Sequence, residues 1–393
     1  MQVCTICDKD WSSIALDSRR FYSPGHHSLD PTTMSALPPI DPDIRHATTL
    51  PGRFYRDPAI YDLLRERLLV PSWHWIGHAT ELAAEHVRPF ELLPGSLDEP
   101  LMLLRDAAGD LSCLSNVCTH RASIVVNEAG PCRALRCGYH GRRFELDGRF
   151  KHMPAFEGAV DFPRPEDDLK RLETGSVCNA LFSSLAPGSS FDEWSAPLQP
   201  LLERLPQADF QFDKSRAATY EVDAHWALYV DNFLEGFHIP YVHPQLAQAL
   251  VDDDYENQLF PSGSLQVGVA RPGDTAFEPQ HRIAGEERPV AAYYYWLTPT
   301  TMFNFYPWGL SVNVVEPLGM QKTRVHFKPY VWRPELLDTG AGGNLDLVQT
   351  EDEDVVEKVQ RGLKSRLYPG GRFSPSKEPG VHHFHRMLAD LLH

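Results

Sequence analysis

Two short loops in the first half of the chain each carry one cysteine and one histidine. The first reads Cys118-Thr-His120 and the second reads Cys137-Gly-Tyr-His140, with sixteen residues between them. Thiolates and imidazoles are good ligands for iron, zinc and copper. The two loops therefore predict a metal site whose ligands come from two loop tips.

The distribution of the ligands over the loops favours one kind of site. Structural zinc usually takes matched pairs, such as C-x2-4-C with H-x3-5-H, or four cysteines. Here both loops are mixed, so each can give one ligand to each iron of a [2Fe–2S] cluster of the Rieske type, in which two cysteines hold one iron and two histidines hold the other. We therefore expect a cluster on four residues, with a zinc knuckle as the alternative: Cys118, His120, Cys137 and His140.

At these residues the sequence resembles the terminal oxygenase (α) subunits of the Rieske non-haem iron oxygenases, and most of all the branch of carnitine, choline and betaine monooxygenases. The resemblance extends from about residue 40 to the end of the chain. One departure is clear. The second loop of the family more often reads C-P-Y-H-G-W, whereas Gly138 follows Cys137 and Arg142 follows Gly141 here. The departure keeps the ligands and changes the surroundings of the cluster.

A second candidate metal site lies in D-N-F-L-E-G-F-H-I-P-Y-V-H-P, residues 231–244. His238 and His243 are about 140° apart around an ideal helix, so a regular helix would not direct both at one ion. Pro240 and Pro244 interrupt the helix and let the chain turn back. Two imidazoles and one carboxylate would make the facial triad of mononuclear non-haem Fe(II).

We expect the carboxylate in the acidic run of residues 351–354. On a helix, Asp352 shares a face with three valines that would form its buried stripe: Val348, Val355 and Val359. We therefore assign the third ligand to Asp352, and the family pattern, with an aspartate five residues before the glutamate of E-x-V-Q-R-G, agrees. The other acidic residues are expected on a solvated face: Glu351, Glu353 and Asp354.

By resemblance, Glu235 lies where the family places a carboxylate that links an iron ligand to a cluster histidine of the neighbouring subunit. A carboxylate that accepts N–H groups from two imidazoles would orient both and couple proton state to electron transfer. On a regular helix Asp231, Glu235 and His238 would share one face. The alternative for Glu235 is an ordinary surface glutamate.

The elements that must position these residues indicate an α+β protein of two domains. Residues 81–187 read as an all-β Rieske domain, because short alternating segments are separated by Gly, Pro and Asp. Residues 188–393 read as a catalytic domain with an antiparallel, helix-grip-like sheet flanked by helices. Expected strands are 73–77, 87–93, 100–105, 111–117, 211–222, 292–297, 301–315 and 323–332, and expected helices in the second domain are 225–239 and 349–367.

Two segments precede these domains. Residues 1–43 are rich in Pro, Ser, Thr and His, which predicts a flexible arm. Residues 44–80 contain a helical apolar pattern and are expected to pack on the catalytic domain. Cys4 and Cys7 fall in the arm without a clear role, whereas three other cysteines are expected in the core: Cys113, Cys132 and Cys178.

The composition excludes some classes of protein. The chain has 37 Lys and Arg against 53 Asp and Glu, a net charge of −16, which argues against nucleic-acid binding. No apolar run approaches the ~18 residues of a membrane span. We therefore expect a cytoplasmic protein that does not bind membranes. Three arginines flank the cluster loops and are expected to dock an acidic electron donor: Arg121, Arg142 and Arg143.

The resemblance implies a function. Electrons from NAD(P)H would pass through a separate reductase or ferredoxin to the cluster and then to Fe(II), where O2 would oxidise a small organic substrate, in a head-to-tail homotrimer. Aromatic residues at 293–308 could form a box for a quaternary ammonium or simply a sheet core. We expect hydroxylation or oxidative demethylation of a small polar substrate. The alternatives are an aromatic ring-hydroxylating α subunit and, from another class, a non-catalytic Rieske electron carrier.

Overall fold

The computed structural model describes residues 37–392, apart from 250–255, 278–280, 284–285 and 344. Most of the expected arm, residues 1–43, and the Cys4 and Cys7 pair lie outside the described residues. No helix in the described part of the chain combines the length and apolar character needed to cross a membrane.

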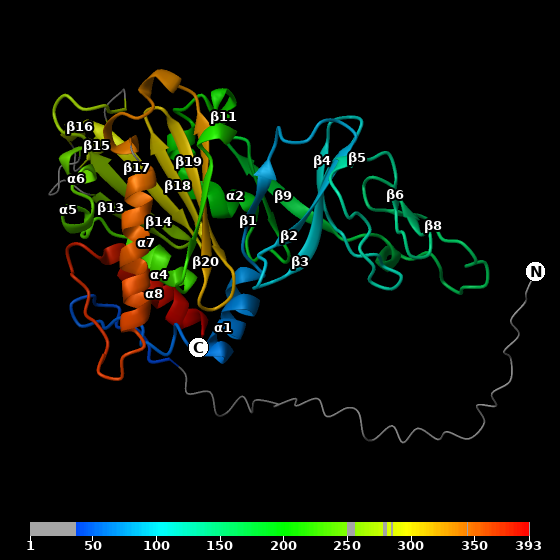
Figure 1. Ribbon diagram of the computed structural model, residues 1–393, viewed down its shortest axis with the longest axis horizontal. Coiled ribbons are helices and arrows are strands. Elements are labelled where there is room, and N and C mark those ends of the chain that lie inside the picture. Colours follow the sequence, from blue (N-terminus) through cyan, green and yellow to red (C-terminus); the bar gives the residue numbers. More distant parts are fainter. Residues whose placement is uncertain (1–36, 250–255, 278–280, 284–285, 344, 393) are drawn as a thin grey trace, which may run out of the picture. The chain divides into compact units, whose positions relative to one another are not determined.

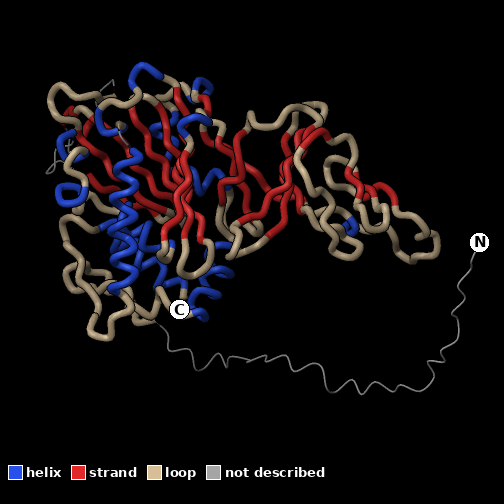
Figure 2. Tube along the Cα trace, viewed as in Figure 1, coloured by secondary structure: helices blue, strands red, loops and turns tan. Residues whose placement is uncertain are grey.

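Residues 74–184 consist mainly of strands and loops (Figure 2). An antiparallel sheet has the order β1-β10-β9-β4-β3-β2-β5, and a smaller sheet has the order β6-β7-β8. The strands are β1 (His74–His78), β2 (His86–Leu92), β3 (Glu99–Arg105), β4 (Leu111–Ser115), β5 (Gly130–Pro131), β6 (Leu135–Arg136), β7 (Arg143–Phe144), β8 (Phe150–His152), β9 (Arg171–Val177) and β10 (Ala180–Ser184). The first cysteine–histidine loop follows β4, and the second connects β6 to β7.

The second part contains an antiparallel sheet in the order β11-β20-β19-β18-β17-β14-β13, with β12 also paired to β20 (Figure 1). Its strands are β11 (Gln211–Phe212), β12 (Ala218–Val222), β13 (Glu256–Phe260), β14 (Gly263–Val269), β17 (Val290–Leu297), β18 (Thr301–Tyr306), β19 (Gly309–Pro317) and β20 (Thr323–Val331), and a separate hairpin pairs β15 (His281–Ile283) with β16 (Glu286–Arg288). Two predicted strands are each divided. A 3-10 turn at Lys214–Arg216 separates β11 from β12, and the turn at Pro307 and Trp308 separates β18 from β19.

Helices accompany this sheet, which confirms the predicted α+β class. They are α1 (Pro58–Leu64), continued by a π-helical turn (Arg65–Leu69), α2 (Phe191–Ser195), α3 (Gln199–Leu202), α4 (Trp226–Phe233), α5 (Ile239–Val242), α6 (Leu246–Ala249), α7 (Leu345–Gly362) and α8 (Pro379–Leu391). Helix α8 was not predicted. Helix α7 begins and ends four to five residues before the predicted range of 349–367.

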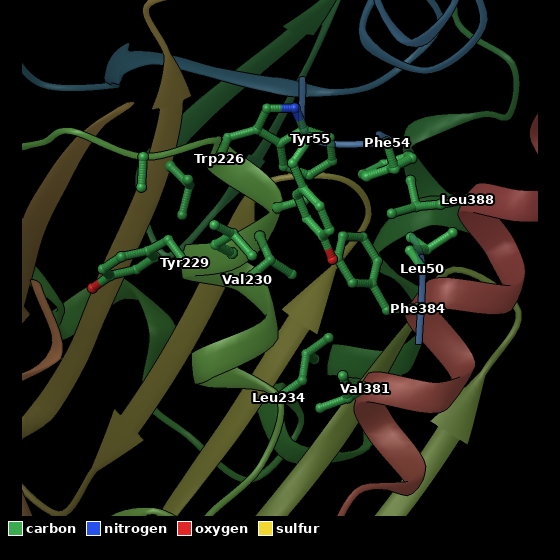
Figure 3. Packing of buried hydrophobic residues seen from close by; sticks show 14 of the residues in the cluster. Leu50, Phe54, Tyr55, Trp226, Tyr229, Val230, Leu234, Val381, Phe384 and Leu388 are labelled. Carbon is green, nitrogen blue, oxygen red and sulfur yellow. The ribbon is translucent and has the colours of Figure 1, made fainter. Parts of the chain in front are cut away.

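A dense apolar cluster fixes α4, the helix that leads to the second candidate site. Figure 3 shows Trp226, Val230 and Leu234 packed beside side chains of α8 and of the segment before α1. The rings of Trp226 and Phe384 lie 5.9 Å apart, edge to face. Each fully buried large apolar side chain contributes about 1.5–3 kcal/mol. The end of α4 is therefore held in a defined place. The other residues labelled there are Leu50, Phe54, Tyr55, Tyr229, Val381 and Leu388.

The buried stripe of α7 differs from the predicted one. Val359 is 44 % exposed, whereas Gln349, Val356 and Gln360 are buried. The glutamines are buried because they bond α4 and the residue before it: the Tyr229 hydroxyl donates to Gln349 Oε1 at 2.5 Å, and Gln360 Oε1 accepts from the backbone N–H of residue 225 at 3.0 Å. The valine pattern misplaced the stripe because polar contacts hold this helix.

Candidate metal centres

The two cysteine–histidine loops have the same backbone form. In the first, Cys118 N–H donates to Ser123 O and Ala122 N–H donates to Cys118 O. In the second, Cys137 N–H donates to Arg142 O and Gly141 N–H donates to Cys137 O. Ala122 and Gly141 both have a positive φ, of 56° and 75°. Each turn therefore presents its cysteine and histidine in the same manner.

The loops bring like ligands together. The Cys118 and Cys137 thiols are buried and hydrogen-bonded to each other, and the His120 and His140 rings lie 4.7 Å apart. One pair of thiols beside one pair of imidazoles is the set that a Rieske-type [2Fe–2S] cluster requires. The four predicted cluster residues thus meet at one place.

Backbone amides favour the thiolate form of the second cysteine. Burial by itself raises the pKa of the Cys137 thiol, but the backbone N–H of Tyr139, a hydrogen bond with Cys118 and the Ser123 hydroxyl outweigh burial and hold this pKa below its ordinary value. Metal ligation requires a deprotonated thiol. The donor set and its surroundings fit the cluster.

The prediction that Arg142 helps to dock an electron donor is wrong. Arg142 is 1 % exposed and pairs with Asp167, so a protein partner has no access to it. Arg121 and Arg143 are exposed, and the Arg121 guanidinium lies 5.6 Å from the centre of the Tyr139 ring. Of the three arginines, Arg121 and Arg143 are thus the two whose positive charge a protein partner can reach.

The second candidate site forms where α4 ends. The predicted helix over 225–239 stops at Phe233, and the chain bends before α5, whose first turn contains Pro240. His238 precedes α5 and His243 follows it. The break returns the second imidazole to the first, and their Nε2 atoms are 3.2 Å apart.

Asp352 joins the two imidazoles from α7. Its Oδ1 lies 2.9 Å from His243 Nε2 and 3.5 Å from His238 Nε2. Neighbouring ligands of an octahedral ion with bonds of ~2.1 Å lie roughly 3 Å apart. Three donor atoms at this spacing occupy one face of such an octahedron, so the set fits a facial triad.

Two further carboxylates hold the far sides of the imidazoles. Glu235 Oε1 lies 2.6 Å from His238 Nδ1, and Glu351 Oε2 lies 2.7 Å from His243 Nδ1. The expectation of a solvated Glu351 is wrong, because its side chain is only 28 % exposed and pairs with a candidate ligand. Sequence reasoning missed this role, because the partner imidazole lies 108 residues earlier in the chain.

The remaining acidic residues of the run behave differently. Asp354 is exposed and pairs with Lys358 one helical turn later. Glu353 accepts from Gln349 Nε2 at 2.9 Å, and burial raises the pKa of its carboxyl. The predicted solvated face therefore applies fully only to Asp354.

Asp231, Glu235 and His238 line one cavity, as a common face would require, but α4 ends at Phe233 and carries only Asp231 of the three. Asp231 accepts from the Tyr55 hydroxyl at 3.1 Å and lies 2.9 Å from His385 Nε2. It therefore anchors α4 to the segment before α1 and to α8.

The electrostatics of the triad suit a cation. Burial by itself lowers the pKa of His238, but its hydrogen bonds to Asp352 and Glu235 outweigh burial and raise this pKa to about 9. Burial raises the pKa of Asp352, yet hydrogen bonds to the two imidazoles bring it below its ordinary value. The surplus of carboxylates around two imidazoles stabilises positive charge at the point where the donor atoms meet.

The triad lines a cavity with about 100 Å³ of space for water-sized molecules. Tyr294 and Tyr306 face it, with ring centres 6.0 Å apart, whereas Tyr293 and Tyr295 pack in the core on the opposite face of the sheet. Successive tyrosines of β17 therefore lie on opposite faces of the sheet. The other aromatic and amide residues that line the cavity are Tyr229, Asn232, Phe233, Asn304, Asn313, Phe327 and Gln349.

Comparisons with known proteins agree with this architecture. Residues 72–163 match the Rieske [2Fe–2S] domain, and residues 211–393 match the ring hydroxylating alpha subunit (catalytic domain). The chain is 30 % identical to the carnitine monooxygenase oxygenase subunit of Escherichia coli strain K12, over 88 % of this chain and 94 % of that one.

Two more proteins are similar over most of the chain. The chloroplastic choline monooxygenase of Arabidopsis thaliana is 29 % identical over 94 % of this chain and 89 % of its own. A quaternary ammonium Rieske monooxygenase in complex with an inhibitor superposes with a TM-score of 0.71 at 25 % identity, covering 91 % of this chain and all of that chain. These matches imply an Fe–S cluster and a mononuclear iron, and the chain belongs to the Rieske oxygenase alpha subunits, close to the carnitine and choline monooxygenases.

Proposed function

We propose that this chain is the oxygenase component of a system that uses O2 to hydroxylate, or to demethylate oxidatively, a small quaternary-ammonium compound. The observation that carries the proposal is one cavity that contains the three ligand atoms of the triad and five aromatic side chains. Aromatic faces attract a quaternary ammonium with about 0.5–2 kcal/mol each. The activities named for the similar choline and carnitine monooxygenases support the same substrate class.

In this proposal His238, His243 and Asp352 hold a ferrous ion. When bound, the ion would supply open coordination positions at which O2 is activated. Glu235 and Glu351 accept the Nδ1–H groups of the two imidazoles, which directs both Nε2 atoms at the common point and fixes the tautomer in which Nε2 can bind the ion once its proton is displaced. The chain therefore orients the ligands through residues that do not themselves touch the ion.

The walls of the cavity would position the substrate. Tyr294 and Tyr306 approach each other edge to face, so their rings offer two surfaces to one cationic group. Ile239, Leu246 and Val348 make part of the wall apolar, which helps to exclude water from the reacting centre.

The cluster would supply the electrons, held by the two cysteine–histidine loops. In our proposal the chain forms a head-to-tail homotrimer, and Glu235 links His238 to a cluster histidine of the neighbouring subunit. This link would connect the cluster to the iron for electron transfer. Its position supports this role, since Glu235 lines both the substrate cavity and a second cavity behind it, with Asp231 and His385. A carboxylate between the two cavities can meet an imidazole from either side.

A separate reductase or ferredoxin, supplied by NAD(P)H, is the proposed source of electrons. The exposed Arg121 and Arg143 would attract an acidic donor on a chain with a net charge of −16. In an Arg121→Glu, Arg143→Glu variant the rate of cluster reduction should fall at low salt and approach that of the wild type at high salt. An unchanged rate at low salt would remove these residues from the docking surface.

The direct test is oxygen consumption by the reconstituted protein with a reductase and a panel of quaternary amines and aromatic compounds. Mass spectrometry separates oxygen insertion from demethylation, which also releases formaldehyde. Turnover of aromatic compounds in place of amines would favour the ring-hydroxylating alternative. Cluster reduction without oxygen consumption on any substrate, in protein whose iron content is complete, would favour an electron carrier.

A matched pair of variants tests the aromatic cavity. Tyr294→Leu removes a ring from the cavity, and Tyr293→Leu removes its neighbour on the opposite face of β17. We expect the first variant to raise KM for a quaternary amine about tenfold with little change in melting temperature, because the lost interaction is with the substrate. The second should lower the melting temperature with a smaller change in KM, and equal effects on KM would contradict the assignment.

A further inference from the structure

Arg142 is a fully buried arginine beside the second cluster loop, where the family more often has tryptophan. Its side chain is 1 % exposed. A guanidinium stays protonated at all ordinary pH values, so this position carries a permanent positive charge inside the protein. Neither the substrate cavity nor the triad accounts for it.

A built cradle holds this charge. Arg142 Nη2 donates to Asp167 Oδ1 at 2.7 Å and to the Asp167 carbonyl at 3.0 Å. Three aromatic rings surround the guanidinium at 4.9–5.6 Å from their centres: Phe144, Phe150 and Phe162. Arg142 Nε is buried without a hydrogen-bond partner among the described residues. Leaving a buried donor unpaired is costly, so the fold holds this guanidinium at an energetic cost.

The negative partner only partly cancels the charge. Asp167 is 16 % exposed, so water screens its carboxylate more than it screens the guanidinium. Because the arginine is the more deeply buried of the two, the field that remains inside the protein is positive.

That field reaches both cluster loops. The carbonyl of Arg142 accepts the N–H of Cys137 at 2.9 Å, and Thr119 Oγ1 donates to the same Asp167 carbonyl as Arg142, at 2.6 Å. The charge therefore lies within electrostatic reach of ligands from both loops.

We propose that Arg142 raises the reduction potential of the [2Fe–2S] cluster. The reasoning rests on the proposed cluster ligands and not on the substrate. Reduction adds one electron, and so one unit of negative charge, to the cluster, and a nearby buried cation stabilises the reduced form more than the oxidised form. Arg142 would make the cluster a better acceptor for the reductase.

The test is a redox titration of the purified, cluster-loaded protein with dithionite, followed by electron spin resonance. Arg142→Gln removes the charge and keeps a planar donor, whereas Asp167→Asn removes the opposing charge. At the ambient potential where the wild-type cluster is half reduced, the ratio of reduced to oxidised cluster should fall about tenfold in the first variant and rise in the second. Opposite signs are the signature of a charge effect.

Two controls separate charge from packing. Arg143→Gln removes the same charge from an exposed neighbour, where water screens it, and should change the ratio much less. Arg142→Lys keeps the charge and loses the fork geometry, so the ratio should stay near the wild-type value even if the melting temperature falls. Shifts of the same sign in Arg142→Gln and Asp167→Asn, or a shift in Arg142→Lys as large as in Arg142→Gln, would overturn the proposal.

Failure here is distinct from failure of the proposed function. The titration needs no substrate, no mononuclear iron and no turnover. Iron and acid-labile sulfide contents show whether each variant holds a cluster before its potential is measured.

Discussion

The two candidate metal centres are assembled in opposite ways. The cluster loops are short, lie nineteen residues apart from cysteine to cysteine, and are each closed by two backbone hydrogen bonds of the same pattern. The triad takes its third ligand from a helix more than one hundred residues after His243, and its imidazoles converge only because a helix breaks between α4 and α5. One centre depends on local turns, and the other depends on the packing of the sheet and its helices.

The difference has an energetic meaning. A local turn fixes its ligands with few residues, so a substitution elsewhere leaves it intact. A site made from distant elements relies on partners that hold the ligands or the helices around them. Glu351 holds His243, and Gln349 on α7 bonds Tyr229 on α4. The triad should therefore be the more sensitive of the two to changes in residues that never touch the ion.

The largest expected effect is on the triad alone. Asp352→Asn should lose the mononuclear iron and lower turnover by roughly a thousandfold or more, because two imidazoles hold the ion weakly. The cluster, with its separate loops, should keep its iron, sulfide and spin-resonance signal. Metal analysis and oxygen consumption measure both. Asp354→Asn, on the exposed side of α7, is the control and should lose neither, and loss of the cluster signal in Asp352→Asn would contradict the independence of the centres.

Next in size is a dependence on pH that only the triad should show. The pKa of His238 is about 9 without metal, above its ordinary value of 6.5. A metal ion must displace that proton, so affinity should rise about tenfold per pH unit from pH 7 to pH 9 and then level off. The folding stability of the metal-free protein should change with pH in the opposite direction to metal affinity. The stabilisation by protonated His238 is complete below pH 6.5 and disappears as pH rises through 9.

Titration calorimetry with Co(II) in buffers of different ionisation enthalpy measures the proton released on binding. Melting of the metal-free protein from pH 6 to pH 10 checks the opposite trend. Affinity that is constant between pH 7 and pH 9 would contradict the protonated state of His238.

A smaller effect tests the residues behind the ligands. Glu351→Gln should lower metal affinity by about 10- to 100-fold, because His243 loses the carboxylate that fixes its ring and its tautomer. Glu353→Gln, two residues away and bonded to Gln349, is the matched control. If the two variants bind Fe(II) equally well, the contact between Glu351 and His243 has no role in metal binding.

The smallest effect compares the two cluster loops with each other. Gly141→Ala places a side chain at a φ of 75° and should cost about 1 kcal/mol. Ala122→Gly removes a side chain from the matching position of the first loop, at a φ of 56°, and should be close to neutral. Thermal unfolding of the cluster-loaded variants measures both. Equal losses would show that the loops do not share one backbone requirement.

The contrast between the centres also explains what the sequence could predict. The cluster residues follow from a motif, because the turns that present them are local and need no tertiary information. Asp352 lies beside the two imidazoles, as the prediction required, although the predicted helical phase was incorrect. It lies three residues after Gln349 and four before Val356, at the edge of the true stripe, so an error of one position in the stripe left it facing the site.

Other features required the folded structure. Glu351 and Asp231 find partners on elements distant in sequence, and no pattern within their own helices announces those partners. Arg142 reads as an exposed cation beside a loop, and only the three rings and Asp167 around it show that it is buried. Polar residues buried by distant partners are the class that periodicity cannot identify.

The carbonyl of Asp167 has a mechanical consequence. It accepts hydrogen bonds from Thr119, between the ligands of the first loop, and from Arg142, two residues after the last ligand of the second loop. A displacement of either loop pulls on the same oxygen atom. We therefore expect the two loop tips to move together, which would keep the spacing of the sulfur and nitrogen ligands constant.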